Sequence, residues 1–433
     1  MRTTFAALAT RNYRLFATGS LVSNVGTWMQ RVAQDWLILT LTASAGALGL
    51  TTGLQFLPIL LFSPLAGVIA DRYPKRRVLA VTQLVLGASA ATLGLLAVTG
   101  TVQPWHVYVL AFVFGTGAAF DMPARQAFVN DLVGPDRLAN AVALNSAGFN
   151  LARMIGPGLA GLLIAWLGSG ATATGWVILV NAATYGAVIV SLARMRTSEL
   201  TPTASIGRGR GQLREGVRYV RNRPDLLLVM AVVFCAGTFG LNFQVTTALM
   251  ATQVYDKGAG EYGLLGSIIA VGSLAGSLVA ARRAKSRQRL IIVAAVIFGV
   301  VTTIAGLMPS YPTFAAILPV CGFAALTLVT AANAFVQMAV DPQVRGRVMA
   351  LYMAIFMGGT AFGSPALGWV AEQFGARWTL IGGGALTALG ALGAAAVFGR
   401  RQGLALATQL RPVPRISVVA RTDDVVAGTV AAA

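Results

Sequence analysis

Charged residues are scarce in this sequence. Asp, Glu, Lys and Arg together make up 11% of its 433 residues, whereas a soluble domain carries roughly 25%. Hydrophobic residues make up 56%, and the mean hydropathy is +0.72. A chain this apolar cannot cover itself with polar surface in water. We therefore expect an all-α integral membrane protein that has lipid as its main solvent.

Cysteine and histidine are nearly absent as well. The two cysteines, Cys235 and Cys321, both lie in apolar stretches, and there is one histidine. This excludes a disulfide framework and a Cys/His metal site. No interior serine stands beside a base, and no Gly-x-x-x-x-Gly-Lys-Ser/Thr phosphate-binding loop occurs. We therefore expect neither an enzyme nor an ATP-driven pump, and neither a metal nor another cofactor.

Apolar stretches of about 20 residues, the length that crosses a bilayer, recur along the whole chain. We place twelve of them near residues 15–40, 46–70, 77–99, 104–122, 138–167, 174–193, 225–250, 261–281, 289–308, 312–338, 345–370 and 378–398. They predict a six-helix bundle over residues 1–193 and a second over 225–400. A basic linker, 194–224, contains an amphipathic helix that lies on the membrane surface. A disordered cytoplasmic tail, 401–433, follows.

The net charge of +19 is unevenly distributed. All but four of the 33 Lys and Arg residues lie at the N-terminus, at every second connection between spans or in the C-terminal tail. Cytoplasmic loops of membrane proteins carry such an excess. The bias toward Arg and Ala indicates a bacterium. We therefore expect a multi-pass protein of the cytoplasmic membrane with both termini in the cytoplasm, and we attribute the charge to topology and anionic lipid instead of nucleic acid.

The two halves of the sequence are similar to each other. SPLAGVIADRYPKRR at 63–77 aligns with GSLAGSLVAARRAKSR at 272–287, and the segment from Pro135 aligns with the segment from Pro342. In the second alignment Gly156 and Gly161 match Gly363 and Gly368. Transporters that move one bundle against the other around a midplane site are often built from such repeats.

A cluster of charge follows the second span, in GVIADRYPKRR. Gly67 permits close approach of a neighbouring helix, and Asp71 then stands among the bases Arg72, Lys75, Arg76 and Arg77. An acid at a helix junction can accept hydrogen bonds from a facing helix N-terminus, while the bases pair across the halves. We expect these residues to hold the cytoplasmic side shut. The alternative is ordinary positive-inside charge.

The first span carries a polar stripe. Helical spacing places four residues on one face, with Gln34 beside them: Asn24, Trp28, Arg31 and Asp35. A charged residue at mid-membrane depth costs at least about 2.5–3.5 kcal/mol, so the stripe should face a central cavity. Asp35 is the candidate for the proton-binding carboxylate, with Arg31 as its charge partner or as an anion-binding group. The alternative is a permanent ion pair that fixes helix packing.

Three further charged residues belong to the fourth and fifth spans. Asp121 and Arg125 end the fourth span at i, i+4, and Arg153 lies inside the fifth with no acid within one turn. A buried charge needs a partner, and Asp121 is our first choice for Arg153. The alternative is that Arg153 extends to the inner headgroups.

The loop GVIADRYPKRR resembles the signature of the major facilitator superfamily, Gly-x-x-x-Asp-Arg-x-Gly-Arg-Arg/Lys. Gly67, Asp71 and Arg72 match, whereas Pro74 and Lys75 replace a glycine and an arginine. NVGTWMQRVAQDWLILTLTAS and FDMPARQAFVNDLVGPDRLANAVALNS resemble the branch of enterobactin-type and macrolide-type exporters. The resemblance covers the whole chain and implies twelve transmembrane helices in two pseudo-symmetric six-helix bundles.

Two further motifs bear on the direction and coupling of transport. In the fifth span, four residues resemble the antiporter motif Gly-x-x-x-Gly-Pro-x-x-Gly-Gly, which implies export: Gly156, Pro157, Gly158 and Gly161. Ala152 and Ala160 replace two of its glycines. In the fourth span, Ala111 stands where drug–proton antiporters usually carry an arginine. Proton coupling should therefore use Asp35, or Asp121 with Arg153.

Few polar residues are candidates for contact with a substrate. Besides Trp28 and Gln34 they are Asn242, Gln244, Asn333 and Gln337, with Phe243 in an apolar wall. A mostly apolar cavity favours amphiphilic substrates. We expect a monomer that exports a small drug or siderophore-like molecule by alternating access and proton antiport. The alternatives are proton-coupled uptake of a metabolite and a non-transporting receptor or scaffold.

Overall fold

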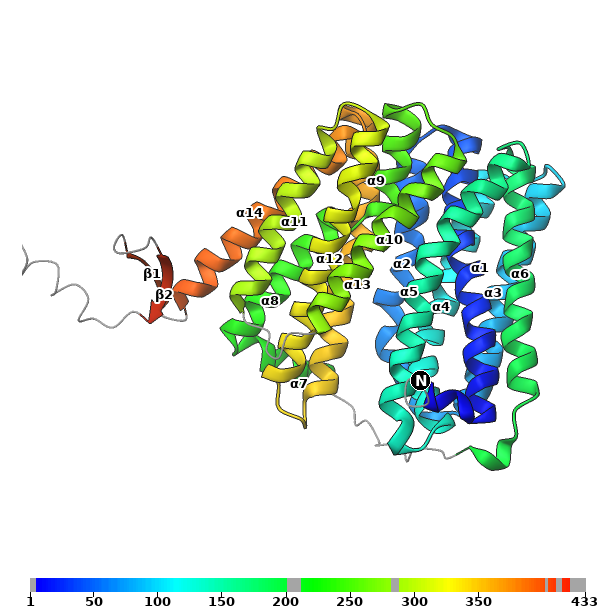
Figure 1. The fold of residues 1–433 in the computed structure, drawn as a ribbon, viewed down its shortest axis with the longest axis horizontal. Helices are drawn as coiled ribbons and strands as arrows, with labels where there is room; N and C mark the ends of the chain where they lie inside the picture. The colour runs from blue at the N-terminus through cyan, green and yellow to red at the C-terminus, as the bar shows by residue number, and fades with distance from the viewer. Residues whose placement is uncertain (1–4, 201–211, 282–287, 402–403, 410–414, 421–433) are drawn as a thin grey trace, which may run out of the picture.

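The computed structural model describes residues 5–200, 212–281, 288–401, 404–409 and 415–420, and nearly all of them are helical (Figure 1). After a short 3-10 helix, η1 (Ala6–Ala9), come α1 (Arg11–Thr42), α2 (Ala45–Arg72), α3 (Lys75–Val98), α4 (Pro104–Leu132), α5 (Pro135–Trp166) and α6 (Ala171–Ala193). The chain continues through η2 (Thr197–Glu199), α7 (Gln212–Arg221), α8 (Pro224–Cys235), η3 (Ala236–Gly240), α9 (Phe243–Leu249) and η4 (Met250–Val254). The last helices are α10 (Ala259–Ala281), α11 (Gln288–Gly306), α12 (Tyr311–Ala339), α13 (Arg345–Phe374) and α14 (Arg377–Arg401).

Eleven helices of the described chain are long and apolar enough to cross a membrane. One of these spans, Pro224–Val254, joins α8 and α9 through the π-helical turns η3 and η4. Helix α1 is not among the eleven because its polar stripe lowers its hydropathy. Its 32 residues are nevertheless roughly 48 Å long, and it packs against α5 and α6. The prediction of an all-α membrane protein is confirmed.

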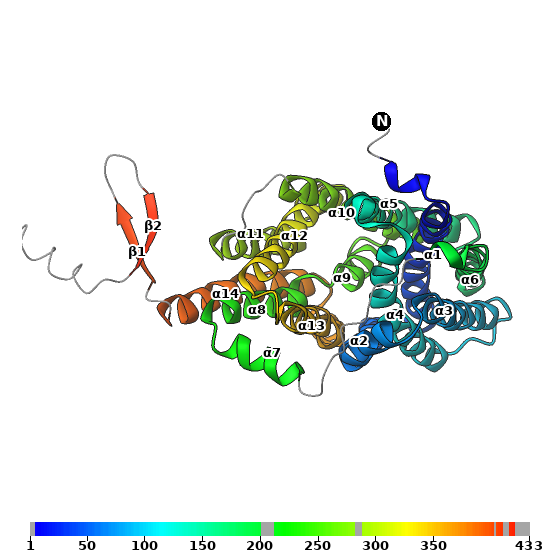
Figure 2. The same ribbon diagram turned by 90° about the horizontal axis from the view of Figure 1, so that it is seen from below.

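The long helices form two bundles, which we name the N-half (α1–α6) and the C-half (α8–α14). In Figure 2, α2 adjoins α13 and α5 adjoins α10, and these two pairs are the main contacts between the halves. The repeat in the sequence aligns α5 with α13 and the end of α2 with the end of α10. The two contacts are therefore equivalent under the repeat, as a pseudo-twofold arrangement requires.

Facing glycines bring the backbones together at both contacts. A Cβ on Gly161 would lie 2.5 Å from the carbonyl oxygen of Ala259 and close to Gly263 of α10. At the equivalent contact, a Cβ on Gly368 would lie 2.6 Å from the carbonyl oxygen of Ala45 in α2. Gly161 and Gly368 are the residues that the sequence repeat aligns. In lipid, helices associate through such small residues because they allow close packing.

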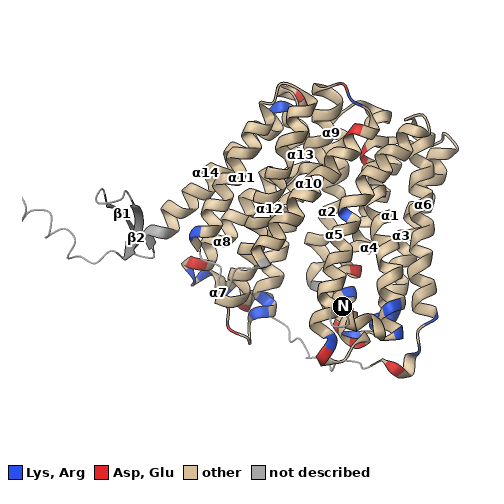
Figure 3. Cartoon of the chain, viewed as in Figure 1, with Lys and Arg blue, Asp and Glu red and all other residues tan. Residues whose placement is uncertain are grey.

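The two ends of the molecule differ in charge. Lys and Arg gather at the end that holds the N-terminus and the α2–α3 connection, which we name the basic end (Figure 3). The ribbons of the halves lie apart at the basic end and converge at the opposite end, where α1 ends and α2 begins (Figure 1). At this opposite end, Glu372 of α13 accepts hydrogen bonds from the Ser44 hydroxyl over 2.5 Å and from the Gly46 N–H over 2.9 Å. The carboxylate thus binds the N-terminus of α2 from the other half.

The linker helix α7 contacts the C-half. Glu215 forms an ion pair with Arg347 of α13 over 2.5 Å, and the Tyr219 hydroxyl donates to Asp341 over 3.1 Å. Val220 is buried among residues of the C-half. The helix predicted to lie on the membrane surface therefore also packs against α13.

The tail beyond residue 401, expected to be disordered, contains two strands. β1 (Leu404–Gln409) and β2 (Arg415–Ala420) pair antiparallel, with Leu404 opposite Ala420. β-Branched residues such as Ile416, Val418 and Val419 favour this conformation.

Candidate functional site

Asp35 joins the two halves inside the molecule. The residue is 0% exposed. Its carboxylate accepts hydrogen bonds from Gln244 Nε2 over 3.0 Å and from the Tyr262 hydroxyl over 2.8 Å. Gln244 belongs to α9 and Tyr262 to α10, so both donors come from the C-half whereas the acceptor lies on α1. Any motion that separates the halves here must break both hydrogen bonds.

Arg31, one turn before Asp35, contacts aromatic rings. Its guanidinium carbon lies 4.7 Å from the ring centroid of Trp28 and 5.6 Å from that of Phe56 in α2. Its Nε atom is buried and has no hydrogen-bond partner among the described residues. The described chain shows no ion pair between Arg31 and Asp35, so the alternative of a permanent ion pair is not seen there; the two charges interact electrostatically without direct contact.

The stripe faces the C-half. Trp28 packs edge-on against Phe149 of α5, with 5.9 Å between the ring centroids, and Phe56 of α2 also lies close to Arg31. Because α2 and α5 adjoin the C-half, the face between them is directed toward it. Asn24, on the same face, is partly accessible. The stripe therefore runs from accessible positions to the buried contact at Asp35.

Gln34 has an unusual environment for an amide. It is 1% exposed, and neither its nitrogen nor its oxygen has a hydrogen-bond partner among the described residues. A buried polar group without a partner costs roughly 1–3 kcal/mol. Its position three residues after Arg31 places it on the adjoining part of the helix surface.

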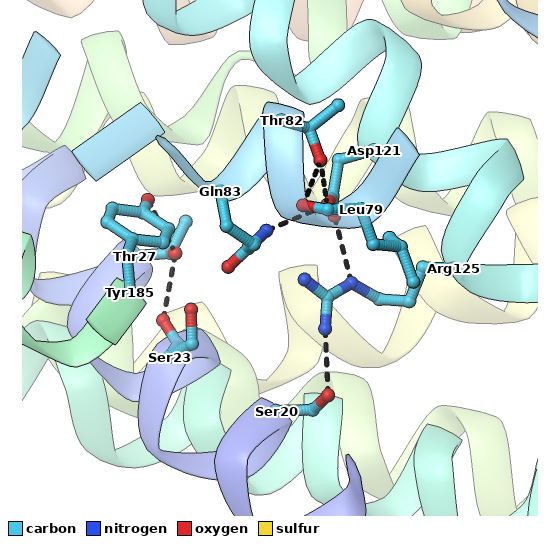
Figure 4. Close-up of polar contacts among 9 residues, drawn as sticks. All are labelled: Ser20, Ser23, Thr27, Leu79, Thr82, Gln83, Asp121, Arg125 and Tyr185. Atoms are coloured by element: carbon cyan, nitrogen blue, oxygen red, sulfur yellow. Dashed lines mark hydrogen bonds and ion pairs between the residues drawn. The ribbon is translucent and has the colours of Figure 1, made fainter. Parts of the chain in front are cut away.

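Asp121 of α4 is the centre of a second polar cluster, inside the N-half (Figure 4). Its Oδ1 accepts hydrogen bonds from Thr82 Oγ1 over 2.8 Å and from Gln83 Nε2 over 2.7 Å. Its Oδ2 forms an ion pair with Arg125 Nε over 2.9 Å, and Arg125 donates to Ser20 Oγ of α1 over 2.8 Å. The cluster ties α1, α3 and α4 together within one half.

A neighbouring set of contacts ties α6 to α1. The Tyr185 hydroxyl lies 3.0 Å from Thr27 Oγ1, which donates to the Ser23 carbonyl over 2.9 Å (Figure 4). Asn181 Nδ2 donates to Gln30 Oε1 over 2.5 Å. The sequence predicted none of these contacts, because isolated Thr and Tyr residues in a span have no spacing signal.

Arg153 does not pair with Asp121, contrary to our first choice. The Asp121 oxygens are bound by Thr82, Gln83 and Arg125, so the nearer arginine on the same helix occupies the carboxylate. Two guanidinium nitrogens of Arg153, Nε and Nη2, are buried without a hydrogen-bond partner in the described chain.

The bases after α2 make contacts inside the N-half. Lys75 forms an ion pair with Asp131 of α4 over 2.9 Å, and Arg76 Nε donates to the Leu192 carbonyl of α6 over 2.8 Å. The expected pairing of Lys75 and Arg76 across the halves is therefore corrected. Asp131 lies beyond the fourth span predicted from the sequence, near the end of α4, so the span boundaries gave no signal for its pairing with Lys75. The remaining members of the loop are exposed or partly exposed: Gly67, Asp71, Arg72 and Arg77.

The small-residue motif of α5 packs this helix on two sides. A Cβ on Gly156 would lie 2.6 Å from Trp28 Cβ in α1. The Gly158 N–H donates to Ser267 Oγ of α10 over 3.0 Å, and a Cβ on Gly263 would lie 2.4 Å from the Pro157 carbonyl oxygen. The motif thus belongs to the contact between the halves.

Two of the residues expected to contact a substrate make hydrogen bonds within the protein. Asn242 is buried, donates to the Thr238 carbonyl over 2.8 Å and accepts from Ser364 over 2.9 Å. It thereby fixes the chain after the π-helical turn η3. Gln244 binds Asp35.

The other candidates lie on α12 and α9. Gln337 Nε2 donates to Asn333 Oδ1 over 2.8 Å, and both residues keep accessible surface. Phe243 packs edge-on against Phe298, with 5.9 Å between centroids. Asn333 and Gln337 therefore remain available for contact with a substrate.

The sequence matches the family described as transmembrane secretion effector over residues 2–412. This is nearly the whole chain, so the protein belongs to that family of the major facilitator superfamily, and the predicted resemblance is confirmed. It is a membrane transporter of a small molecule.

Among its relatives is the multidrug efflux pump Tap of Mycolicibacterium fortuitum, 29% identical over 370 residues, which are 82% of this chain and 86% of Tap. Macrolide efflux protein A of Streptococcus pyogenes is 23% identical over 86% of this chain and 92% of its own length. The staphyloferrin A transporter of Staphylococcus aureus is 33% identical over 35% of this chain and 38% of its own length.

The fold is that of solved transporters. A bacterial homologue of the lysosomal transporter Spinster, in an inward-facing and occupied conformation, superposes with a TM-score of 0.70 at 16% identity. The match covers 90% of this chain and 97% of that one.

Proposed function

We propose that the protein exports a small amphiphilic molecule, drug or siderophore-like, across the bacterial cytoplasmic membrane by alternating access coupled to proton antiport. The efflux proteins among its relatives support export. In this proposal the basic end and both termini face the cytoplasm, because cytoplasmic segments carry the excess of Lys and Arg. The end at which the halves meet is then the outer end, and a monomer is the transporting unit.

The observation that carries the proposal is the contact of Asp35 with Gln244 and Tyr262. Hydrogen bonds to an ionised acceptor are roughly twice as strong as those to a neutral one. The carboxylate form of Asp35 therefore favours the state in which the outer ends meet. When the halves separate at this end, the carboxylate loses both donors and meets external water, from which it takes a proton. Return to the inward-open state restores the donors and favours release of that proton to the cytoplasm.

Asp121 is the weaker candidate for the coupling residue. Its hydrogen bonds and its ion pair all lie within the N-half. A rigid N-half that moves against the C-half leaves these contacts unchanged. Asp121 and Arg125 are assigned to the stability of the N-half, and Asp35 to the coupling of proton and substrate.

Transport of a fluorescent amphiphile into inside-out vesicles tests direction and coupling together. With the lumen acidified, the proposal predicts accumulation in the lumen and its loss when an ionophore collapses the pH gradient. Accumulation that survives the ionophore excludes proton coupling. Accumulation only in right-side-out vesicles supports uptake instead, and a lack of movement in either orientation supports a receptor or scaffold.

A further inference from the structure

We propose that the transported molecule carries a carboxylate that Arg31 binds beside Trp28 and Phe56, so that the substrates are anionic amphiphiles. The inference rests on the proposed export function and adds the charge of the substrate to it. It starts from polar groups that the protein itself leaves without partners.

The positive charge of Arg31 lacks a counterion in direct contact. Its guanidinium lies against Trp28 and Phe56, and its buried Nε has no hydrogen-bond partner in the described chain. Asp35, one turn along the helix, interacts with this charge electrostatically, but its carboxylate oxygens are bound by Gln244 and Tyr262. A buried charge is normally paired. The side chain keeps some accessible surface, so an incoming anion can supply the missing partner.

Gln34 provides a second donor next to Arg31. It is 1% exposed, and both polar atoms of its amide are without a partner among the described residues. Its N–H groups can donate to the same anion that Arg31 binds. The planar guanidinium presents paired N–H donors that match the two oxygens of a carboxylate, which is why a carboxylate is the chemistry that fits.

Arg153 adds a second positive charge on the same side of the N-half. It follows Phe149 by one turn of α5, and the ring of Phe149 packs against that of Trp28. Two of its nitrogens are buried without a partner in the described part of the chain. Two arginines of the N-half with buried N–H groups that lack a partner among the described residues attract an anion and repel a cationic amphiphile.

The aromatic rings fit the apolar part of such a molecule. Trp28 and Phe56 lie against Arg31, and Phe149 packs against Trp28, so flat apolar surface lies beside the charge. An anion bound to Arg31 also lies one helical turn from the Asp35 carboxylate and repels it. This repulsion weakens the contact with Tyr262 and links substrate binding to separation of the outer ends.

Three probes with the same ring and different charge test the inference: 2-naphthoate, 2-naphthamide and 2-naphthylmethylammonium. Thermal unfolding of the full chain in lipid nanodiscs is measured as each probe is titrated. We expect naphthoate to raise the unfolding temperature, and the amide and the ammonium compound to have much smaller effects. Arg31→Gln should weaken naphthoate binding by about tenfold or more, since a charge-assisted hydrogen bond is lost.

Three further variants keep the result interpretable. Arg31→Lys should retain part of the affinity for naphthoate, because it keeps the positive charge but not the paired N–H donors of a guanidinium. Arg14→Gln is the matched control, since it removes an exposed positive charge of α1 at the basic end and should leave binding unchanged. If Arg31→Gln does not fold, Gln34→Met removes an unpartnered amide and should still lower the affinity for naphthoate.

Equal stabilisation by all three probes, or a naphthoate effect that survives in Arg31→Gln and Gln34→Met, overturns the inference. A transport assay distinguishes failure of this inference from failure of the proposed export function. Export of the ammonium probe but not of naphthoate rejects the anionic substrate and leaves export intact. If naphthoate binding depends on Arg31 but the protein moves no probe in either direction, the anion-binding site is supported and the export function is rejected.

Discussion

Tyr262 donates its phenolic hydrogen to Asp35 over 2.8 Å, and the two residues belong to opposite halves of the protein. Both side chains are buried, at 2% and 0% exposed. The hydrogen bond lies where the halves meet, on the side of the molecule remote from the basic end. In the proposed mechanism it links the ionisation of Asp35 to the separation of the two bundles.

Removing this hydroxyl should favour opening of the outer end. A hydrogen bond to a charged group contributes about 1.5–3 kcal/mol, so Tyr262→Phe should shift the equilibrium toward the outward-open state by about tenfold or more. Spin labels at Trp166 and Leu307, which are 80% and 60% exposed at the outer ends of the two halves, report the change as a longer distance. The labels require a background without Cys235 and Cys321.

Tyr219→Phe is the matched control for this change. The Tyr219 hydroxyl donates to Asp341 at the basic end over 3.1 Å. This hydrogen bond does not link the two bundles at the outer end. An equal lengthening in Tyr219→Phe, or none in Tyr262→Phe, contradicts the role given to Asp35.

The glycine contact between α5 and α10 should tolerate no side chain. In Gly161→Ala the new Cβ would lie 2.5 Å from the Ala259 carbonyl oxygen. This contact is too short, so the backbones of α5 and α10 must move apart. We expect a longer distance between the labels at Trp166 and Leu307 and a severe loss of transport. Gly186→Ala is the control, because nothing lies within 4 Å of a Cβ at that position. Normal transport by Gly161→Ala would show that the halves need not approach this closely.

Asp121 should matter for stability and not for coupling. Asp121→Ala leaves Arg125 without its carboxylate inside the N-half, and breaking a buried pair in this way costs about 3–5 kcal/mol. Thermal unfolding should therefore show a large loss, whereas Glu199→Ala, which removes an exposed ion pair with Arg196, should change stability by less than about 1 kcal/mol. Transport by the folded fraction of Asp121→Ala should keep its dependence on pH; loss of that dependence would move the coupling role to Asp121.

Spacing along a helix determined which features of the site could be predicted. Asn24, Trp28, Arg31 and Asp35 lie on one face because the helical period places them there, and the high cost of charge in lipid directs that face inward. The repeat in the sequence likewise aligned Gly161 with its counterpart in α13. These inferences need only the geometry of a single helix or a comparison of the two halves of the sequence.

Partners on other helices could not be predicted in this way. Tyr262 lies 227 residues from Asp35, and nothing in its own segment marks it as a donor. Arg153 was paired with Asp121 on the ground that a buried charge needs a counterion, but Arg125 already occupies that carboxylate. Which residues of different helices meet depends on tertiary packing, and that information is not contained in residue spacing.

The most direct test of the coupling role of Asp35 is proton movement during transport in proteoliposomes that contain a pH-sensitive dye. For the intact protein, substrate export should be accompanied by an opposite flux of protons, and the rate of export should depend on the pH of the outer compartment. Asp35→Asn, which keeps the size of the side chain but cannot ionise, should abolish both effects while the protein still folds and binds substrate. Proton flux that persists in folded Asp35→Asn would contradict the mechanism.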